Sequence, residues 1–119
     1  MAGTLVANTI NTDTGLFSTN NAYLGIAKAW VNFAGATGTI NGSFNVSSVT
    51  RVSTGSYTVN LTTAMPNANY ALTISGIVGG SGRSCYSDTA PTTTSFTVYC
   101  TNGASVVDPT QVWAVAFSS

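Results

Sequence analysis

The run Ser56-Tyr-Thr-Val-Asn-Leu61 carries the clearest fold signal in the chain. Tyr57, Val59 and Leu61 alternate with three polar residues, so an extended backbone would point all three apolar side chains to one side. Strict alternation of this kind is typical of a strand with one buried side and one solvent-facing side. The run therefore predicts an antiparallel strand whose apolar residues belong to the core.

The same period-two pattern recurs on both sides of that run. Further candidate strands are Lys28–Phe33, Val46–Val52, Tyr70–Ser75, Ser95–Cys100 and Gln111–Phe117. Turn signals separate them, and the strongest is Asn41-Gly42, which predicts a hairpin turn between Thr39-Ile40 and Ser43-Phe44. No window shows a convincing helical stripe. About six to eight short strands, with turn signals every 8–12 residues, predict an all-β fold, an antiparallel β-sandwich or a small barrel.

Residues 1–26 differ from the rest of the chain. Short extended stretches flank the turn sequence Asn11-Thr-Asp-Thr-Gly15, and they are too short to build a core of their own. We therefore expect two parts, a short extended N-terminal arm over 1–26 and a β-sandwich domain over 27–119. The arm would pack on the sandwich, on a sister subunit or on a larger particle.

Charge is scarce in this chain. Of its 119 residues only six are charged, three Lys or Arg and three Asp, and there is neither His nor Glu. Thr, Ser and Asn instead supply 20, 14 and 11 polar residues. General acid–base catalysis and transition-metal binding usually need His or clustered carboxylates and thiols. Phosphate neutralisation needs several Lys or Arg. The composition thus predicts a non-enzymatic protein with no cofactor, no metal and no nucleic-acid partner.

The chain also lacks targeting signals. Its most apolar stretch, residues 23–38, contains Lys28 and Asn32 and is too short to cross a bilayer. The N-terminus has no basic region followed by an apolar run, so a Sec signal peptide is not expected. We therefore predict no membrane insertion, synthesis in the cytoplasm, and release by a route such as lysis.

The two cysteines are Cys85 and Cys100, 15 residues apart. On neighbouring strands they would form a disulfide, which for a loop of this length contributes roughly 3 kcal/mol. Two buried free thiols in a reducing cytoplasm fit the sequence equally well. The sequence leaves both alternatives open.

Several residues are candidates for binding. The loop Gly79–Gly82 is most simply a flexible connection between strands, but if the tip of the domain binds a ligand, Arg83 and Tyr86 are the residues to test, because binding residues concentrate on loops. The isolated Asp13 and Asp88 are more typical of turn caps than of calcium ligands. A sugar-stacking platform is the alternative role for the larger aromatic residues, but most of them lie at expected inward positions, which favours the core; Tyr86 and Tyr99 are the least clear. These residues are Tyr23, Trp30, Tyr57, Tyr70, Tyr86, Tyr99 and Trp113.

Three stretches carry a resemblance to a known family. They are Ala27-Lys-Ala-Trp-Val-Asn-Phe-Ala-Gly35, Ile40-Asn-Gly-Ser-Phe-Asn-Val-Ser-Ser-Val-Thr-Arg51 and Gly55-Ser-Tyr-Thr-Val-Asn-Leu-Thr-Thr-Ala-Met-Pro-Asn-Ala-Asn-Tyr70. The chain resembles a β-domain of bacteriophage tail-fibre and other virion structural proteins, especially forms from phages of aquatic bacteria. The likeness covers residues 27–75 well and 94–119 loosely.

The resemblance implies a virion structural protein, a tail-fibre or appendage tip that contacts the host surface as an adhesin. It also implies a homotrimer, attached to other virion proteins through residues 1–26, with a host cell-surface glycan or protein as the further partner. Such domains usually end a long fibre, whereas almost no shaft sequence precedes this one. A capsid decoration or cement protein and a small tail adaptor are therefore alternatives, and a free-standing carbohydrate-binding module is a third.

Overall fold

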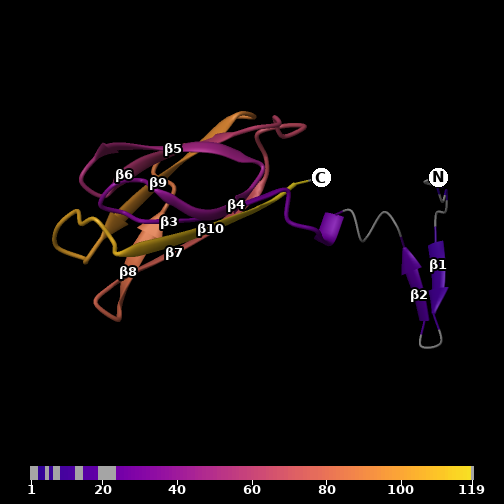
Figure 1. Cartoon of the computed structure of the whole chain (residues 1–119), viewed down its shortest axis with the longest axis horizontal. Coiled ribbons are helices and arrows are strands. Elements are labelled where there is room, and N and C mark those ends of the chain that lie inside the picture. The colour runs from indigo at the N-terminus through magenta and orange to yellow at the C-terminus, as the bar shows by residue number, and fades with distance from the viewer. Residues whose placement is uncertain (1–2, 5, 7–8, 13–14, 19–23, 119) are drawn as a thin grey trace.

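The structure is a computed structural model, and it describes residues 3–4, 6, 9–12, 15–18 and 24–118. Within these residues, eight strands form one antiparallel sheet (Figure 1). They are β3 (Ala29–Phe33), β4 (Ile40–Phe44), β5 (Val46–Ser53), β6 (Ser56–Leu61), β7 (Ala71–Val78), β8 (Ser81–Tyr86), β9 (Ser95–Thr101) and β10 (Gln111–Phe117). Two shorter strands, β1 (Thr9–Thr12) and β2 (Gly15–Ser18), pair with each other and lie apart from this sheet.

The strand order is β4-β3-β10-β7-β8-β9-β6-β5. The sheet passes from one layer of the sandwich to the other at β8. The first half of β8 pairs with β7 as far as Arg83, and its second half pairs with β9 from Ser84 onward. The strand therefore joins a layer made of β4, β3, β10 and β7 to a layer made of β9, β6 and β5. The predicted all-β sandwich or small barrel is confirmed.

Asn45 connects the two edge strands of the sheet, β4 and β5. It has φ 56°, a left-handed conformation that Asn tolerates better than most residues. Its side chain donates to the Lys28 and Thr63 carbonyls and accepts from the Thr63 amide. Asn45 is thus held in place between the two edge strands, each of which is paired on one side, β4 with β3 and β5 with β6.

Alternation places the core where the sequence predicts it for most strands. The inward residues of β6, Tyr57, Val59 and Leu61, are buried, and the Phe33 and Tyr57 rings meet edge to face at 5.0 Å between centroids. Phe96 and Val98 of β9 are also buried, as predicted. On β3 and β10 the buried residues are Ala29, Val31, Phe33, Val112, Ala114 and Ala116.

The two tryptophans contradict the prediction that they belong to the core. Because Ala29 and Val31 of β3 and the alternate residues of β10 face inward, Trp30 and Trp113 stand on the outer side of the sheet. Trp30 is 42% exposed and Trp113 is half-buried. The space between the layers is filled by other residues, with Phe33, Tyr57 and Phe96 as the buried rings from the strands.

The predicted Asn41-Gly42 hairpin turn is also wrong. Both residues lie within β4, and the chain reverses earlier, at residues 34–39, where Gly38 has φ 75° and its amide donates to the Ala34 carbonyl. The register between β3 and β4 shifts next to Asn41. The Asn-Gly pair therefore marks a β-bulge rather than a turn, another site where this dipeptide is favoured.

The flexible connection expected at Gly79–Gly82 is shorter than predicted. Gly79 and Gly80 form the turn with φ 53° and 83°, while Ser81 and Gly82 already pair with β7 as part of β8.

In the described ranges, no helix has the length and hydropathy that a bilayer crossing needs.

A candidate binding face on the outer sheet

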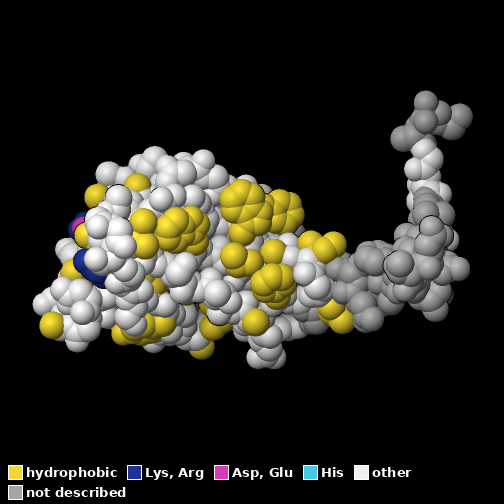
Figure 2. Space-filling view, turned by 90° about the horizontal axis from the view of Figure 1, so that it is seen from below, with side chains coloured by type: hydrophobic (Ala, Val, Ile, Leu, Met, Phe, Trp, Pro, Cys, Tyr) yellow, Lys and Arg dark blue, Asp and Glu magenta, His cyan; other side chains and the backbone are white. Residues whose placement is uncertain are grey.

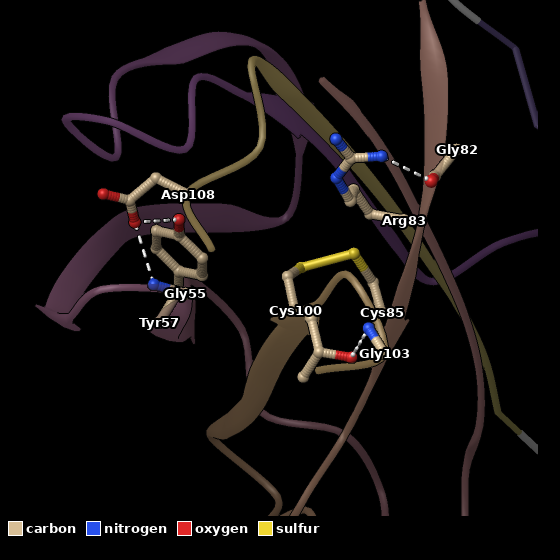
Figure 3. The surroundings of a disulfide bond; sticks show 9 residues. Gly55, Tyr57, Gly82, Arg83, Cys85, Cys100, Gly103 and Asp108 are labelled. Carbon is tan, nitrogen blue, oxygen red and sulfur yellow. Dashed lines mark hydrogen bonds between the residues drawn. A yellow bond between two sulfur atoms is a disulfide. The ribbon is translucent and has the colours of Figure 1, made fainter. Parts of the chain in front are cut away.

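Arg83 and Tyr86, the residues predicted to contact a host surface, lie on opposite faces of β8. Arg83 points to the same side as Cys85, and its Nη1 donates to the Ser81 and Gly82 carbonyls at 3.3 and 2.9 Å (Figure 3). Tyr86 is 46% exposed, and its ring lies 5.5 Å from the Tyr99 ring. The fold therefore does not unite the two side chains in one site, and their role in binding stays a prediction.

A disulfide joins Cys85 of β8 to Cys100 of β9 (Figure 3). The two residues are direct partners in the strand register, with their Cα atoms 4.2 Å apart. Gly76 of β7 makes room for the bridge, because a Cβ atom there would lie 2.8 Å from the Cys85 sulfur. The disulfide thus fixes β8 at the point where it passes from one layer to the other.

Asp108 forms the centre of a polar cluster at the end of the sandwich remote from the N-terminal arm. Its Oδ1 accepts from the Tyr57 hydroxyl at 2.7 Å and from the Gly55 amide at 2.8 Å, and its Oδ2 pairs with Arg51 Nη2 at 2.7 Å. The amide that Asp108 caps belongs to Gly55, in the turn between β5 and β6 (Figure 3).

Protonation equilibria follow from these bonds. The Arg51 guanidinium, together with the other donors, lowers the pKa of Asp108 to about 2. Burial, followed by the hydrogen bond to Asp108, raises the pKa of Tyr57, so its hydroxyl stays a donor. The Asp108 carboxylate is fully used in joining two loops, which makes it a structural group rather than a reactive one.

Of the two remaining acidic candidates, the structure describes Asp88. Asp88 accepts a hydrogen bond from Thr97 Oγ1 at 2.7 Å, as a residue that fixes a loop would. Asp13 falls outside the described residues. Across the part of the chain that the structure describes, no three His, Cys, Asp or Glu side chains gather where they could hold a metal ion.

The most distinctive surface of the molecule is the outer side of the layer β4-β3-β10-β7, which we call the outer aromatic face. Its apolar residues are Trp30, Phe44, Trp113, Val115 and Phe117. Phe44, Trp30 and Val115 are consecutive cross-strand neighbours, so they form one row over three strands. Trp30, Phe44 and Phe117 are 42, 54 and 38% exposed. Figure 2 shows hydrophobic side chains gathered on one side of the sandwich.

The Trp30 ring has a fixed place within that row. Its outer edge lies over Gly42 of β4, 3.5 Å from the position that a Cβ atom would take. Gly42 thus lets the indole lie against the neighbouring strand, where a larger side chain would compete for the same space. The ring therefore has one edge supported by β4 and a large part open to solvent.

Three amide side chains adjoin the aromatic residues, and we call them the amide cluster. Asn32 Oδ1 accepts from Gln111 Nε2 at 2.8 Å and from Asn41 Nδ2 at 3.2 Å. Asn32 lies two residues after Trp30 on the same face of β3, and its partner in the register with β10 is Trp113. The cluster and the outer aromatic face form one continuous surface without charge.

An open groove borders the outer aromatic face near the start of β3. It has a volume of about 670 Å³ and shares Phe44 with that face. The other lining residues are Ile26, Ala27, Lys28, Asn45, Thr62, Thr63, Ala64, Met65 and Pro66. Its walls are mostly apolar, and Phe44 extends them onto the sheet.

Comparison with known proteins gives no relative: no family model, no curated protein and no solved structure matches the chain.

Sequence reasoning missed the outer aromatic face, although one signal for it is present. In β10 both alternating sets are apolar, Val112, Ala114 and Ala116 on one side and Trp113, Val115 and Phe117 on the other. A strand with two apolar sides has either both sides covered or a contact surface on one of them. The larger residues belong to the outer set, although their size alone would predict that they lie in the core.

Proposed function

We propose that the chain is a non-enzymatic bacteriophage virion protein, a host-contact domain at the tip of a tail fibre or similar appendage. The outer aromatic face is the observation that carries this proposal. It offers exposed rings on the hydrogen-bonded strands β4, β3 and β10. Exposed aromatic residues on a rigid support are characteristic of contact surfaces. The sequence resemblance over residues 27–75 supplies the virion context.

In this proposal the homotrimer and the attachment to other virion proteins both depend on residues 1–26. The short strands of the arm, β1 and β2, pair with each other and not with the described strands of the sandwich. The arm is therefore the segment that we assign to assembly, and the outer aromatic face is left to the host surface.

Electron microscopy of phage particles labelled with antibodies against this chain tests the proposal. We expect label at the tips of tail appendages and a reduced rate of adsorption when purified protein occupies the host receptors first. Label spread over the capsid lattice would replace the appendage role with that of a decoration protein. Complete absence of the chain from purified particles would refute the virion role altogether.

A further inference from the structure

We infer that the outer aromatic face and the amide cluster together bind an uncharged oligosaccharide, with Trp30 as the ring on which a sugar stacks. This inference rests on the proposed host-contact function and specifies its ligand, although the chemistry of the face stands without the virion context. The argument proceeds from the shape of the rings, the polar groups beside them, the area of the face and its charge.

The aromatic row suits the apolar side of a sugar. A pyranose has a face of C–H groups, and such groups pack on the electron-rich face of an aromatic ring. Trp30 has the largest π-face, it is 42% exposed, and Gly42 supports one edge of its indole. Phe44 and Val115 flank it on the neighbouring strands and lengthen the row.

The amide cluster suits the hydroxyl rim of the same sugar. Both of its internal bonds use the Asn32 Oδ1 atom as acceptor. The Asn32 Nδ2 group and the side-chain amide oxygens of Asn41 and Gln111 take no part in those two bonds. Hydroxyl groups donate and accept at once, so neighbouring amide donors and acceptors in a fixed arrangement match them. A protein partner with an apolar patch would make no use of these amides.

The exposed area fits a small ligand better than a second copy of the chain. Trp30, Phe44 and Phe117 together expose roughly 270 Å² of aromatic surface, since such a side chain covers about 200 Å². A stable protein interface buries around 800 Å² on each partner. The three rings alone supply about a third of that area. A few stacked sugar units need no more than the row provides.

The charge of the face selects among glycans. Strands β3, β4, β7 and β10 contain no charged residue, and the nearest is Lys28, which immediately precedes β3. Arg51 is paired with Asp108 at the far end of the sandwich, and Arg83 bonds to carbonyls of its own strand. The strands of the face offer no cation to sialylated, sulfated or uronic sugars, and Lys28, which lines the adjoining groove with Phe44, is the one cation that we place at its border. We therefore expect uncharged glycans to bind best.

The test is binding of the full-length protein to an immobilised array of hexose and N-acetylhexosamine oligosaccharides that also contains carboxylated and sulfated glycans. We expect binding to uncharged structures. Titration with the uncharged oligosaccharide that gives the strongest signal should then protect tryptophan fluorescence from acrylamide quenching. This second readout uses the unmodified protein, so it does not depend on any variant folding.

Two substitutions locate the site. Trp30→Ala should weaken oligosaccharide binding about tenfold or more, because truncated tryptophans are common among dominant contact residues. Asn32→Ala should weaken it as well. The control is Val52→Ala, which truncates an apolar side chain that is 64% exposed on β5, in the other layer, and should leave binding unchanged.

Three outcomes would overturn the inference: no binding to any uncharged glycan, binding that survives Trp30→Ala, or loss of self-association with Trp30→Ala in sedimentation without glycan binding. The last outcome would assign the face to a second copy of the chain. If the protein binds no glycan but antibodies still label the appendage, the oligosaccharide inference is refuted and the proposed virion role is retained. Glycan binding by a chain absent from particles would instead retain the inference and refute the virion role.

Discussion

Asp108 joins two loops through a single carboxylate that accepts from Arg51, Gly55 and Tyr57. Two of these partners are poorly accessible: the Tyr57 side chain is buried, and so is Gly55. Buried donors lose much more when their acceptor is removed than exposed ones do. The stability of the end of the sandwich therefore depends heavily on this one residue.

We expect Asp108→Ala to lower the free energy of unfolding by about 2–3 kcal/mol, because Tyr57 and Gly55 would keep donors without an acceptor. Denaturant titration followed by tryptophan fluorescence measures the change. Asp88→Ala is the control, since Asp88 accepts one exposed bond from Thr97 and should cost less than about 1 kcal/mol. Equal effects of the two substitutions would contradict the central role of Asp108.

The same carboxylate makes stability depend on acid. Its pKa is about 2 in the folded chain and 3.8 ordinarily, so the folded state favours the ionised form. The contribution is therefore complete above pH 4 and is lost as the pH falls through about 2. Unfolding curves between pH 5 and pH 2 should show a steeper loss of stability for the unmodified chain than for Asp108→Asn. Identical slopes would show that Asp108 contributes no pH dependence.

At the scale of elements, β8 determines how the sheet folds over. It pairs with β7 in its first half and with β9 in its second, and the disulfide lies in the second half. Gly76 leaves the space for the Cys85 sulfur, so β7, β8 and β9 are adapted to one another at a single point. Loss of the bridge should loosen the connection between the two layers.

We expect Cys85→Ala combined with Cys100→Ala to lower the free energy of unfolding by roughly 3 kcal/mol, the value typical of a closed loop of this length. Reductant should destabilise the unmodified chain by a similar amount and leave the double variant unaffected. Alkylation of the denatured chain without reductant, followed by mass spectrometry, checks the bridge directly. Modification of both cysteines under those conditions would mean that the thiols are free.

How much of the fold follows from sequence is clearest in individual strands. Strands β6 and β10 begin and end where alternation predicts, because turn residues bound both. Strand β8 has no apolar alternation, and the sequence predicts a loop where it begins. Its conformation depends on pairing with β7 and β9, which its own residues do not indicate. Asn41-Gly42 suits a bulge as well as a turn, and only the register distinguishes them.

The candidate site was harder to predict than the fold. Alternation shows that Trp30 and Val31 point to opposite sides, but it does not say which side meets the other layer. That choice depends on the volume available between layers, where Phe33 and Tyr57 already meet. The amide cluster brings together Asn32 and Gln111, which are 79 residues apart in the sequence. A local sequence pattern does not predict a contact over that separation.

At the scale of the whole molecule, three positive and three negative charges leave the chain neutral. Neutral copies repel one another little, and salt has few charges to screen. The polar sides of the strands use Thr, Ser and Asn in place of Lys and Glu. Such a surface suits a subunit that stands close to copies of itself in media of changing ionic strength.

The proposed homotrimer should therefore be insensitive to salt. Sedimentation equilibrium of the full chain at low and at near-molar sodium chloride should give three times the monomer mass of 12.1 kDa at both. Assembly that relied on ion pairs would weaken as salt rises, which would argue against an interface of neutral residues. A monomer under all conditions would refute the trimer.

The position of Trp30 also has a mechanical consequence. Trp30 lies on β3, the strand that continues directly from the N-terminal arm, and β3 is hydrogen-bonded on both sides, to β4 and β10 (Figure 1). A pulling force between a sugar held at Trp30 and a particle held by the arm would run along a few residues of this one strand. The tension would not pass through the disulfide or the Asp108 cluster, which lie on other parts of the chain. A particle tethered in flowing water could then strain its attachment without stretching the domain that makes it.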